Sequence, residues 1–297
     1  MSDKFMAQAL KLAALGGRAV APNPMVGAVI VKNGKIIGQG YHQKFGGPHA
    51  EVLAIKSVKR QTDLQGATLY VTLEPCRHYG KTPPCQDLIE KVGIKKVVCG
   101  SRDPFQQKFK IPDSKFQIFL KGPIAKACQK LNKFYFTWIT QKRPYITVKI
   151  ATSADNFIAG PNKKPIHFTS KAQDKRVHQL RARHQAIMVG SGTVLADNPS
   201  LTVRYVKGPD PLRIILDPQN RIPKTAKVFK DKNFLHITQK IPLKTLFKTL
   251  AKNGIASILV EPGPTLYTAL KKTGWIDELI VLKGKKKIKV GLALKIC

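Results

Sequence analysis

Three short segments in the first third of the chain constrain its fold more than any other feature. His49 lies at the start of an expected helix, while Cys76 and Cys85, each preceded by proline, follow an expected strand and precede a second helix. One imidazole and two thiolates can hold Zn²⁺ and leave a fourth position for water. A lone His or Cys is usually structural, but this ordered set in a strand–loop–helix frame predicts a zinc hydrolase.

Glu51 lies two residues after His49 and is expected to move protons rather than bind the metal. A bound metal lowers the pKa of water towards about 7, and a nearby carboxylate can take the water proton and pass it to a departing nitrogen. Cys99 and Cys128 are expected to be ordinary core or surface residues, and Cys297 is the last residue of the chain.

Apolar and turn residues predict alternating strands and helices in the first half. Asn33-Gly34 lies between two apolar runs, which is the strongest short signal for a hairpin. The expected strands are Val26–Val31, Lys35–Gly40, Ala67–Leu73 and Lys96–Gly100, and the expected helices are Phe5–Ala14, His49–Arg60 and Gln86–Val92. This alternation indicates an α/β layer with parallel strands.

The polar segment Gln141–Pro144 contains a helix-breaking proline, so we place a domain boundary there, giving domains 1–143 and 144–297. Beyond it, the expected strands are Tyr145–Ala151, Ala186–Val189, Leu212–Leu216, Ile255–Val260 and Leu279–Leu282, and the expected helices are Lys171–Arg183 and Leu266–Lys272. The halves show no internal repeat, which predicts two different α/β domains.

The chain carries 52 Lys and Arg against 17 Asp and Glu, a formal net charge of +35. Such a surface attracts nucleic acid, anionic membranes or phosphorylated metabolites. Because only 11 of the cations are Arg, the Lys are dispersed and aromatics make up 7%, a general Lys-rich bias is favoured over a nucleic-acid footprint. The sequence has no apolar run of roughly 20 residues, so no membrane association is expected. It also has no disulfide framework, so a cytoplasmic protein is expected.

The spacing of the two thiols separates classes of deaminase. Nucleoside and RNA-editing deaminases usually have Pro-Cys-x-x-Cys, whereas eight residues lie between Cys76 and Cys85. Together with PNPMVGAVIV, GYHQKFGGPHAE and VTLEPC, this spacing closely resembles the pyrimidine deaminase domain of the bifunctional riboflavin-biosynthesis deaminase/reductase family. The resemblance covers most of residues 1–104, weakens after Asp103-Pro104 and recovers at Leu131–Phe134.

This resemblance implies a cytidine-deaminase-like three-layer domain that deaminates 2,5-diamino-6-(5-phosphoribosylamino)pyrimidin-4-one. It implies that His49, Cys76 and Cys85 bind zinc and that Glu51 is the catalytic proton shuttle. The residues implied to bind the phosphorylated pyrimidine ribosylamine are Asn23, His42, His78 and Lys81.

The second half resembles the dihydrofolate-reductase-like α/β domain of the same family through ITVKIATSAD, VLADNP, LTVR and VEPGPTL. The last motif is a buried strand, a Gly/Pro turn and a helix start, whose free N–H groups can hold a phosphate. The resemblance implies reduction of the ribosyl chain to ribityl by NADPH. Implied cofactor-binding residues are Ala151, His167, Thr193, Asp197, Gly263, Pro264, Thr265 and Leu266. Implied substrate-binding residues are Asp155, Arg181, Leu201, Arg204 and Glu261.

The second domain also departs from its family. Asp155 is followed by Asn156 instead of glycine, His167 stands where a tryptophan usually stacks on the cofactor, and the chain ends 19 residues after Glu278, a shortened end. Its last segment is expected to form one closing strand. The reading is a two-domain enzyme of riboflavin synthesis, with a possible homo-oligomer through the reductase domain. The alternatives are a deaminase with an inactive reductase-like domain, or an RNA-binding base deaminase.

Overall fold

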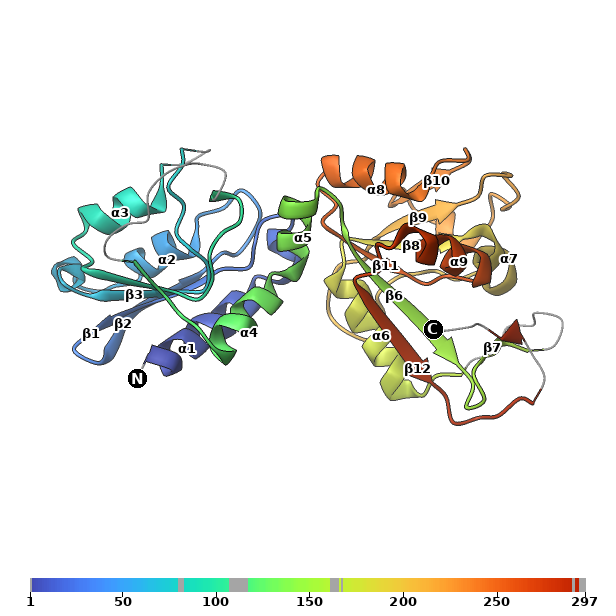
Figure 1. Ribbon diagram of the computed structural model, residues 1–297, viewed down its shortest axis with the longest axis horizontal. Helices are drawn as coiled ribbons and strands as arrows, with labels where there is room; N and C mark the ends of the chain where they lie inside the picture. Colours follow the sequence, from blue (N-terminus) through green and yellow to red (C-terminus); the bar gives the residue numbers. More distant parts are fainter. Residues whose placement is uncertain are drawn as a thin grey trace. The chain divides into compact units, whose positions relative to one another are not determined.

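The computed structural model describes residues 2–79, 83–106, 117–160, 166, 168–289 and 292–293. The chain divides into two compact units, residues 1–141 and 142–297, which we call domain 1 and domain 2 and describe separately. Both are mixed helix and sheet structures (Figure 1).

Domain 1 is built on a five-stranded sheet in the order β2-β1-β3-β4-β5. Its strands are β1 (Gly27–Lys32), β2 (Lys35–Tyr41), β3 (Thr68–Val71), β4 (Lys96–Cys99) and β5 (Gln117–Phe119). The β1 strand is antiparallel to β2 and β3, whereas β3, β4 and β5 are parallel. The predicted hairpin is confirmed, because Asn33 and Gly34 join β1 to β2 with φ of 49° and 72°, as a tight two-residue turn requires.

Helices cover both faces of this sheet, which confirms the expected three layers (Figure 1). Alternate residues of β1 point to opposite faces. Val29 and Val31 pack with Phe5 of α1 (Ser2–Leu15), whereas Ala28 and Ile30 pack with residues of the other helical layer. The first layer also contains α4 (Pro123–Leu131), and the second contains α2 (Ala50–Lys56), α3 (Cys85–Lys91) and residues of α5 (Lys133–Gln141).

The α2 helix is shorter than the sequence predicted. It ends at Lys56, where the Ser57 hydroxyl donates to the Ala54 carbonyl at 2.7 Å and accepts the Gln39 N–H at 2.8 Å. A Ser side chain that bonds nearby backbone competes with continuation of a helix. A separate 3₁₀ turn, Gln61–Leu64, follows.

Domain 2 contains a six-stranded sheet in the order β10-β9-β8-β11-β6-β12, in which all neighbours are parallel. Its strands are β6 (Tyr145–Thr152), β8 (Ala186–Gly190), β9 (Leu212–Leu216), β10 (Phe234–Ile237), β11 (Ser257–Val260) and β12 (Glu278–Lys283). Because all six strands run in one direction, their carboxyl ends meet at a single edge of the sheet.

Helices cover both faces of this sheet too. One core joins Val148 and Met188 to Phe247 of α8 (Leu243–Lys252) and to residues of α9 (Pro264–Thr273). The opposite core joins Ile187 and Val189 to residues of α6 (Lys171–Arg183) and α7 (Ser191–Asp197). The buried strands therefore read as nearly continuous apolar runs.

The segment around the proposed boundary is less linker-like than its composition suggested. Arg143 is 6% exposed, and its guanidinium donates to both oxygens of Asp277 at 2.6 and 2.7 Å. Asp277 also accepts the N–H of Ile146 at 2.8 Å, at the start of β6. Arg143 therefore forms a largely buried ion pair within domain 2, whereas Gln141 and Lys142 of the same segment are exposed.

The closing strand expected from the last segment is confirmed only as a short pairing. Within the described residues, β13 (Leu292–Ala293) is antiparallel to β7 (Phe157–Ala159). The Asp155 carboxylate accepts the N–H groups of Ile288 and Lys289, the latter at 2.8 Å. This Asp-to-backbone contact ties the last segment to the β6–β7 turn.

One close approach in domain 1 yields a stability prediction. A Cβ atom on Gly27 would overlap the backbone carbonyl of Ala9, so α1 and β1 can approach this closely only with glycine there. We expect Gly27→Ala to destabilise domain 1 by about 3 kcal/mol, because backbone cannot yield as a side chain does. Calorimetry should show a domain 1 transition lowered by at least about 5 °C. Gly192→Ala is the control, because a Cβ there would meet no atom within 4 Å. Equal shifts of the transition temperature in the two variants would contradict the close packing of α1 against β1.

Candidate active sites

The three predicted metal ligands converge in domain 1. His49 immediately precedes α2, Cys85 is the first residue of α3, and Cys76 lies in the loop after β3. Their nitrogen and sulfur atoms all lie within 4.8 Å of one another, with His49 Nδ1 at 3.2 Å from Cys85 Sγ and 3.6 Å from Cys76 Sγ. One imidazole and two thiols at this spacing form a three-ligand set that fits zinc with an open fourth position.

The electrostatics of the cluster favour a thiolate at Cys76. The hydrogen bond with Cys85 is the main cause that lowers the pKa of Cys76 to about 4, and the His49 ring lowers this pKa further. The Cys85 N–H also donates to Cys76 Sγ at 3.2 Å. In turn, the hydrogen bond to Cys76 raises the pKa of His49 to about 9. A thiolate is the form of cysteine that binds metals.

Glu51 lies beside this cluster on the first turn of α2 and is only 4% exposed. Burial is the main cause that raises its pKa to about 7, and the Cys76 thiolate adds to the rise. A carboxylate whose pKa lies near neutrality can both accept and return a proton.

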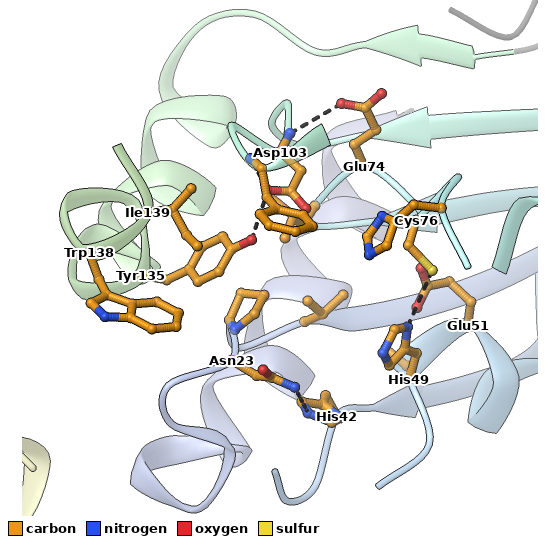
Figure 2. A pocket seen from close by; sticks show the side chains of 16 residues that line it. Asn23, His42, His49, Glu51, Glu74, Cys76, Asp103, Tyr135, Trp138 and Ile139 are labelled. Carbon is orange, nitrogen blue, oxygen red and sulfur yellow. Dashed lines mark hydrogen bonds between the residues drawn. The ribbon is translucent and has the colours of Figure 1, made fainter. Parts of the chain in front are cut away.

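A cavity of about 310 Å³ extends from the cluster (Figure 2). In this view His49, Glu51 and Cys76 lie at one end of the cavity lining and Trp138 lies at the other. The lining residues are Asn23, Pro24, Val26, His42, His49, Ala50, Glu51, Leu73, Glu74, Cys76, His78, Asp103, Phe105, Tyr135, Trp138 and Ile139.

The structure brings Asn23 and His42 together on one wall of the cavity. His42 Nδ1 lies 2.9 Å from the carbonyl of Pro48, and because a carbonyl only accepts, this nitrogen carries the ring proton. Burial lowers the pKa of His42, which favours the neutral ring. Its Nε2 then accepts the Asn23 amide at 3.3 Å, which leaves the Asn23 carbonyl oxygen for a donor on a ligand.

Sequence reasoning missed the opposite wall, which Asp103, Phe105 and three α5 residues provide. The scarcity of acids in this chain was the available signal for Asp103, which lies four residues after the end of β4, in the motif SRDPF. Nothing in the sequence places α5 against this cavity. His78 also lines the cavity and packs edge-on against Phe105, with ring centroids 5.0 Å apart, whereas Lys81 lies outside the described residues.

A buried ion pair shapes the loop that carries Cys76. Arg77 donates to Glu74 Oε1 at 2.6 Å, and both side chains are less than a tenth exposed. The other Glu74 oxygen accepts the Asp103 N–H at 3.1 Å, while Gln106 bonds the Pro75 carbonyl at 2.9 Å. These contacts join the loops that follow β3 and β4, which parallel pairing brings to the same edge.

In domain 2, the predicted residues gather at the carboxyl edge of the sheet. Thr193 and Asp197 lie on α7 directly after β8, and Glu261 directly follows β11. Gly263 precedes α9, and a Cβ there would lie 3.5 Å from Thr193 Oγ1. Pro264, Thr265 and Leu266 form the first turn of α9, where no side chain caps the backbone N–H groups. This open turn fits the phosphate of a dinucleotide.

An ion-pair cluster occupies this edge. Arg181 donates through Nε and a terminal nitrogen to the two oxygens of Glu261 at 3.0 and 3.1 Å, and Lys149 lies 3.3 Å from the same carboxylate. Although burial raises the pKa of Glu261, the two cations lower it to about 2. The predicted Arg181 fork therefore faces Glu261 in this structure, rather than standing open for a phosphate.

The other predicted reductase residues are placed differently. The Arg204 side chain is exposed, and the backbone N–H of Arg204 donates to His178 Nδ1 at 2.8 Å. Burial and the nearby Arg181 lower the pKa of His178 to about 4. Leu201 is 2% exposed, and Ala151 lies near the end of β6. Asp155 contacts the last segment instead of the Glu261 cluster, and His167 lies outside the described residues.

Comparisons with known proteins cover both domains. The family described as the cytidine and deoxycytidylate deaminase zinc-binding region matches residues 1–101. The family described as the RibD C-terminal domain matches residues 144–284. Among the described residues, no helix is both long and apolar enough to span a membrane.

Curated relatives match along nearly the whole chain. The riboflavin biosynthesis protein RibD of Aquifex aeolicus is 39% identical over 99% of this chain and 90% of its own length. The RibD protein of Escherichia coli is 36% identical over 96% of this chain and 88% of its own length.

Solved structures agree with these relatives. A diaminohydroxyphosphoribosylaminopyrimidine deaminase/5-amino-6-(5-phosphoribosylamino)uracil reductase of Thermotoga maritima is 36% identical, with a TM-score of 0.88 over 99% of this chain and 89% of that one. Acinetobacter baumannii RibD is 33% identical, with a TM-score of 0.87 over 100% of this chain and 90% of that one.

The geometry of the cluster predicts how metal binding depends on its thiols. Cys76→Ala should remove one of three ligands, so zinc should fall from about one ion per chain to a small fraction of that. Plasma emission spectrometry of the purified protein measures this content. Cys99→Ala, which removes a buried thiol from β4 outside the cluster, should keep its zinc. Full zinc in Cys76→Ala would refute the assigned ligand set.

Proposed function

This chain belongs to the RibD family of bifunctional riboflavin biosynthesis proteins, and we propose which of its residues carry each of the two reactions. The enzyme hydrolytically deaminates 2,5-diamino-6-(5-phosphoribosylamino)pyrimidin-4-one and then reduces the ribosyl chain to ribityl with NADPH. The convergence of His49, Cys76 and Cys85 beside the buried Glu51 is the observation that supports our assignment of the first reaction.

His49, Cys76 and Cys85 would hold the zinc ion of the deaminase. Zinc, when bound, supplies a Lewis acid that allows water to ionise near neutral pH. The Glu51 carboxylate takes a proton from water and delivers it to the departing amine nitrogen, so the same oxygen atoms serve both transfers. Burial of Glu51 keeps bulk water from competing for this proton.

The two walls of the cavity orient the pyrimidine. The Asn23 carbonyl oxygen, left open by the bond from its amide to His42, accepts one N–H of the ring edge. The Asp103 carboxylate on the opposite wall accepts a second N–H. A flat heterocycle held from both edges presents its amine-bearing carbon to Glu51, and such positioning lowers the barrier of the reaction. His78 and Lys81 are the proposed contacts of the ribosyl phosphate.

In the reductase, NADPH supplies the hydride. The N–H groups at the start of α9, with Thr193 and Asp197, hold the cofactor, and Ala151 and His167 complete its contacts. Gly263 supports this assignment, because it leaves the turn without a side chain next to Thr193 Oγ1, which a Cβ would meet at 3.5 Å. Because Glu261 fixes Arg181, we assign the substrate phosphate to the exposed Arg204, whose guanidinium also donates to the Thr202 hydroxyl at 3.0 Å. Leu201 and Asp155 are proposed as further contacts.

The alternatives are less well supported. A deaminase with an inactive second domain is not favoured, since residues 144–284 match the RibD C-terminal domain. RNA editing is not favoured either, because the two-thiol spacing differs from that of editing deaminases. If the +35 charge is a compositional bias, RNA binding at physiological salt should be weak and independent of sequence.

Location and assembly are further proposals. Cys76, Cys85, Cys99 and Cys128 form no disulfide, which supports a reducing cytoplasm. Exposed Leu279 and Val281 on the edge strand β12 support a homo-oligomer formed through domain 2.

A first prediction separates metal binding from proton transfer. Glu51→Gln should retain about one zinc per chain and lose deamination by a factor of about 10³ or more, because the amide cannot shuttle the proton. Mass spectrometry of the product and zinc content are measured together. The exposed Glu90→Gln on α3 is the matched control. Normal deamination by Glu51→Gln would overturn the mechanism.

A second prediction concerns the reductase phosphate site. Arg204→Met should raise the reductase KM for the deaminated, phosphorylated intermediate about tenfold, as expected for loss of one charge-assisted contact. NADPH oxidation measured at 340 nm reports this KM. Deamination in the other domain and the exposed Arg176→Met on α6 serve as controls. An unchanged reductase KM would exclude Arg204 from the phosphate site.

A further inference from the structure

The start of the α5 helix holds both polar walls of the deaminase cavity. Asn132, immediately before α5 and 2% exposed, bonds both backbone groups of Met25: it accepts the Met25 N–H and donates to the Met25 carbonyl, each at 2.8 Å. Met25 lies two residues after Asn23. One helical turn later, the Tyr135 hydroxyl donates to Asp103 Oδ1 at 2.9 Å, as Figure 2 shows. Residues three apart lie on the same helix face.

The surroundings of Asp103 leave one of its oxygens open. Asp103 is 7% exposed, and its Oδ1 accepts both the Tyr135 hydroxyl and the Phe105 N–H, the latter at 2.9 Å. Within the described chain, no hydrogen bond ends on Oδ2. The charged groups that face this carboxylate are Glu74, which repels it, and His78, which attracts it when protonated. A buried carboxylate without a paired cation needs hydrogen-bond donors to stay ionised.

We propose that Tyr135 is a positioning residue of the deaminase, which acts by fixing Asp103 so that Oδ2 faces an N–H group of the pyrimidine. This inference rests on the proposed function of the cavity and extends it to a helix that carries no residue of the metal cluster. Tyr135 holds the Asp103 carboxylate, and Asn132 holds the loop that carries Asn23. A single turn of chain thereby sets the spacing of the two walls between which the heterocycle lies.

Tyr135 is suited to this role because it remains a donor. Burial and the neighbouring Asp103 carboxylate raise the pKa of the Tyr135 hydroxyl, so it stays protonated at neutral pH. The ring is 8% exposed and packs in the core beside Ile139, which limits the rotation of the hydroxyl. Without the hydroxyl, Asp103 Oδ1 retains only the Phe105 N–H, and the carboxylate is free to rotate or to become protonated.

The test is Tyr135→Phe, which keeps the packed ring and removes only the hydroxyl. We expect the KM for the pyrimidine substrate to rise about tenfold, with kcat changed less than about threefold, because Asp103 contacts substrate and transition state alike. Zinc content should stay at one ion per chain, and the reductase in the same chain should be unchanged. Tyr70→Phe, which alters a half-buried tyrosine on β3 outside the cavity, should leave the KM unchanged.

A double-mutant cycle distinguishes positioning from general stability. In an Asp103→Asn background, Tyr135→Phe should have no further effect on the KM, because the contact it supports is already lost. An unchanged KM in Tyr135→Phe, or an equal rise in both backgrounds, would overturn the proposal. Failure of the proposed function would differ, since Glu51→Gln would then deaminate normally whatever the effect of Tyr135→Phe.

Discussion

Parallel pairing of strands is the constraint on which both sites depend. In domain 1, pairing of β3 with β4 brings the loop that carries Cys76 beside the loop that carries Asp103. In domain 2, pairing of β11 with β8 and β6 brings Glu261, Thr193 and Lys149 to neighbouring positions. Parallel strands need long crossovers, and the helices α2, α3, α6 and α7 are parts of such connections. The crossover connections that cover the sheets therefore also carry functional residues of both sites.

The scarce acids of this chain are used where they fix geometry. Glu74 pairs with Arg77 beside the metal cluster, and Glu261 receives two cations at the reductase edge. Removing one partner of such a buried pair typically costs about 3–5 kcal/mol, because the remaining charge stays desolvated. Against 52 cations, 17 acids cannot neutralise the surface, but those beside the sites hold loops and side chains in place.

The sequence predictions are accurate where the structure depends on residues close together in the chain, and they fail where it depends on distant segments. The β1–β2 hairpin needed only Asn33-Gly34 and its apolar flanks, and helix α6 and strand β9 were bounded correctly from their local patterns. The extent of α2 was wrong, because Ser57 bonds with a neighbouring strand that local pattern does not reveal. Helix α5 and the cavity wall that it forms were missed. Apolar periodicity indicates that one face of a helix is buried, but it does not indicate which other element that face packs against.

The identities and order of His49, Glu51, Cys76 and Cys85 determined the metal chemistry, since ligand type and charge are properties of the residues themselves. The alternation of strands and helices likewise determined two α/β domains. Only the tertiary structure decided how side chains from distant segments pair. It placed Arg181 on Glu261 and directed Asp155 to the last segment. It also brought the Tyr135 hydroxyl within hydrogen-bond distance of Asp103, because a hydrogen bond between groups 32 residues apart depends on packing that no local pattern encodes.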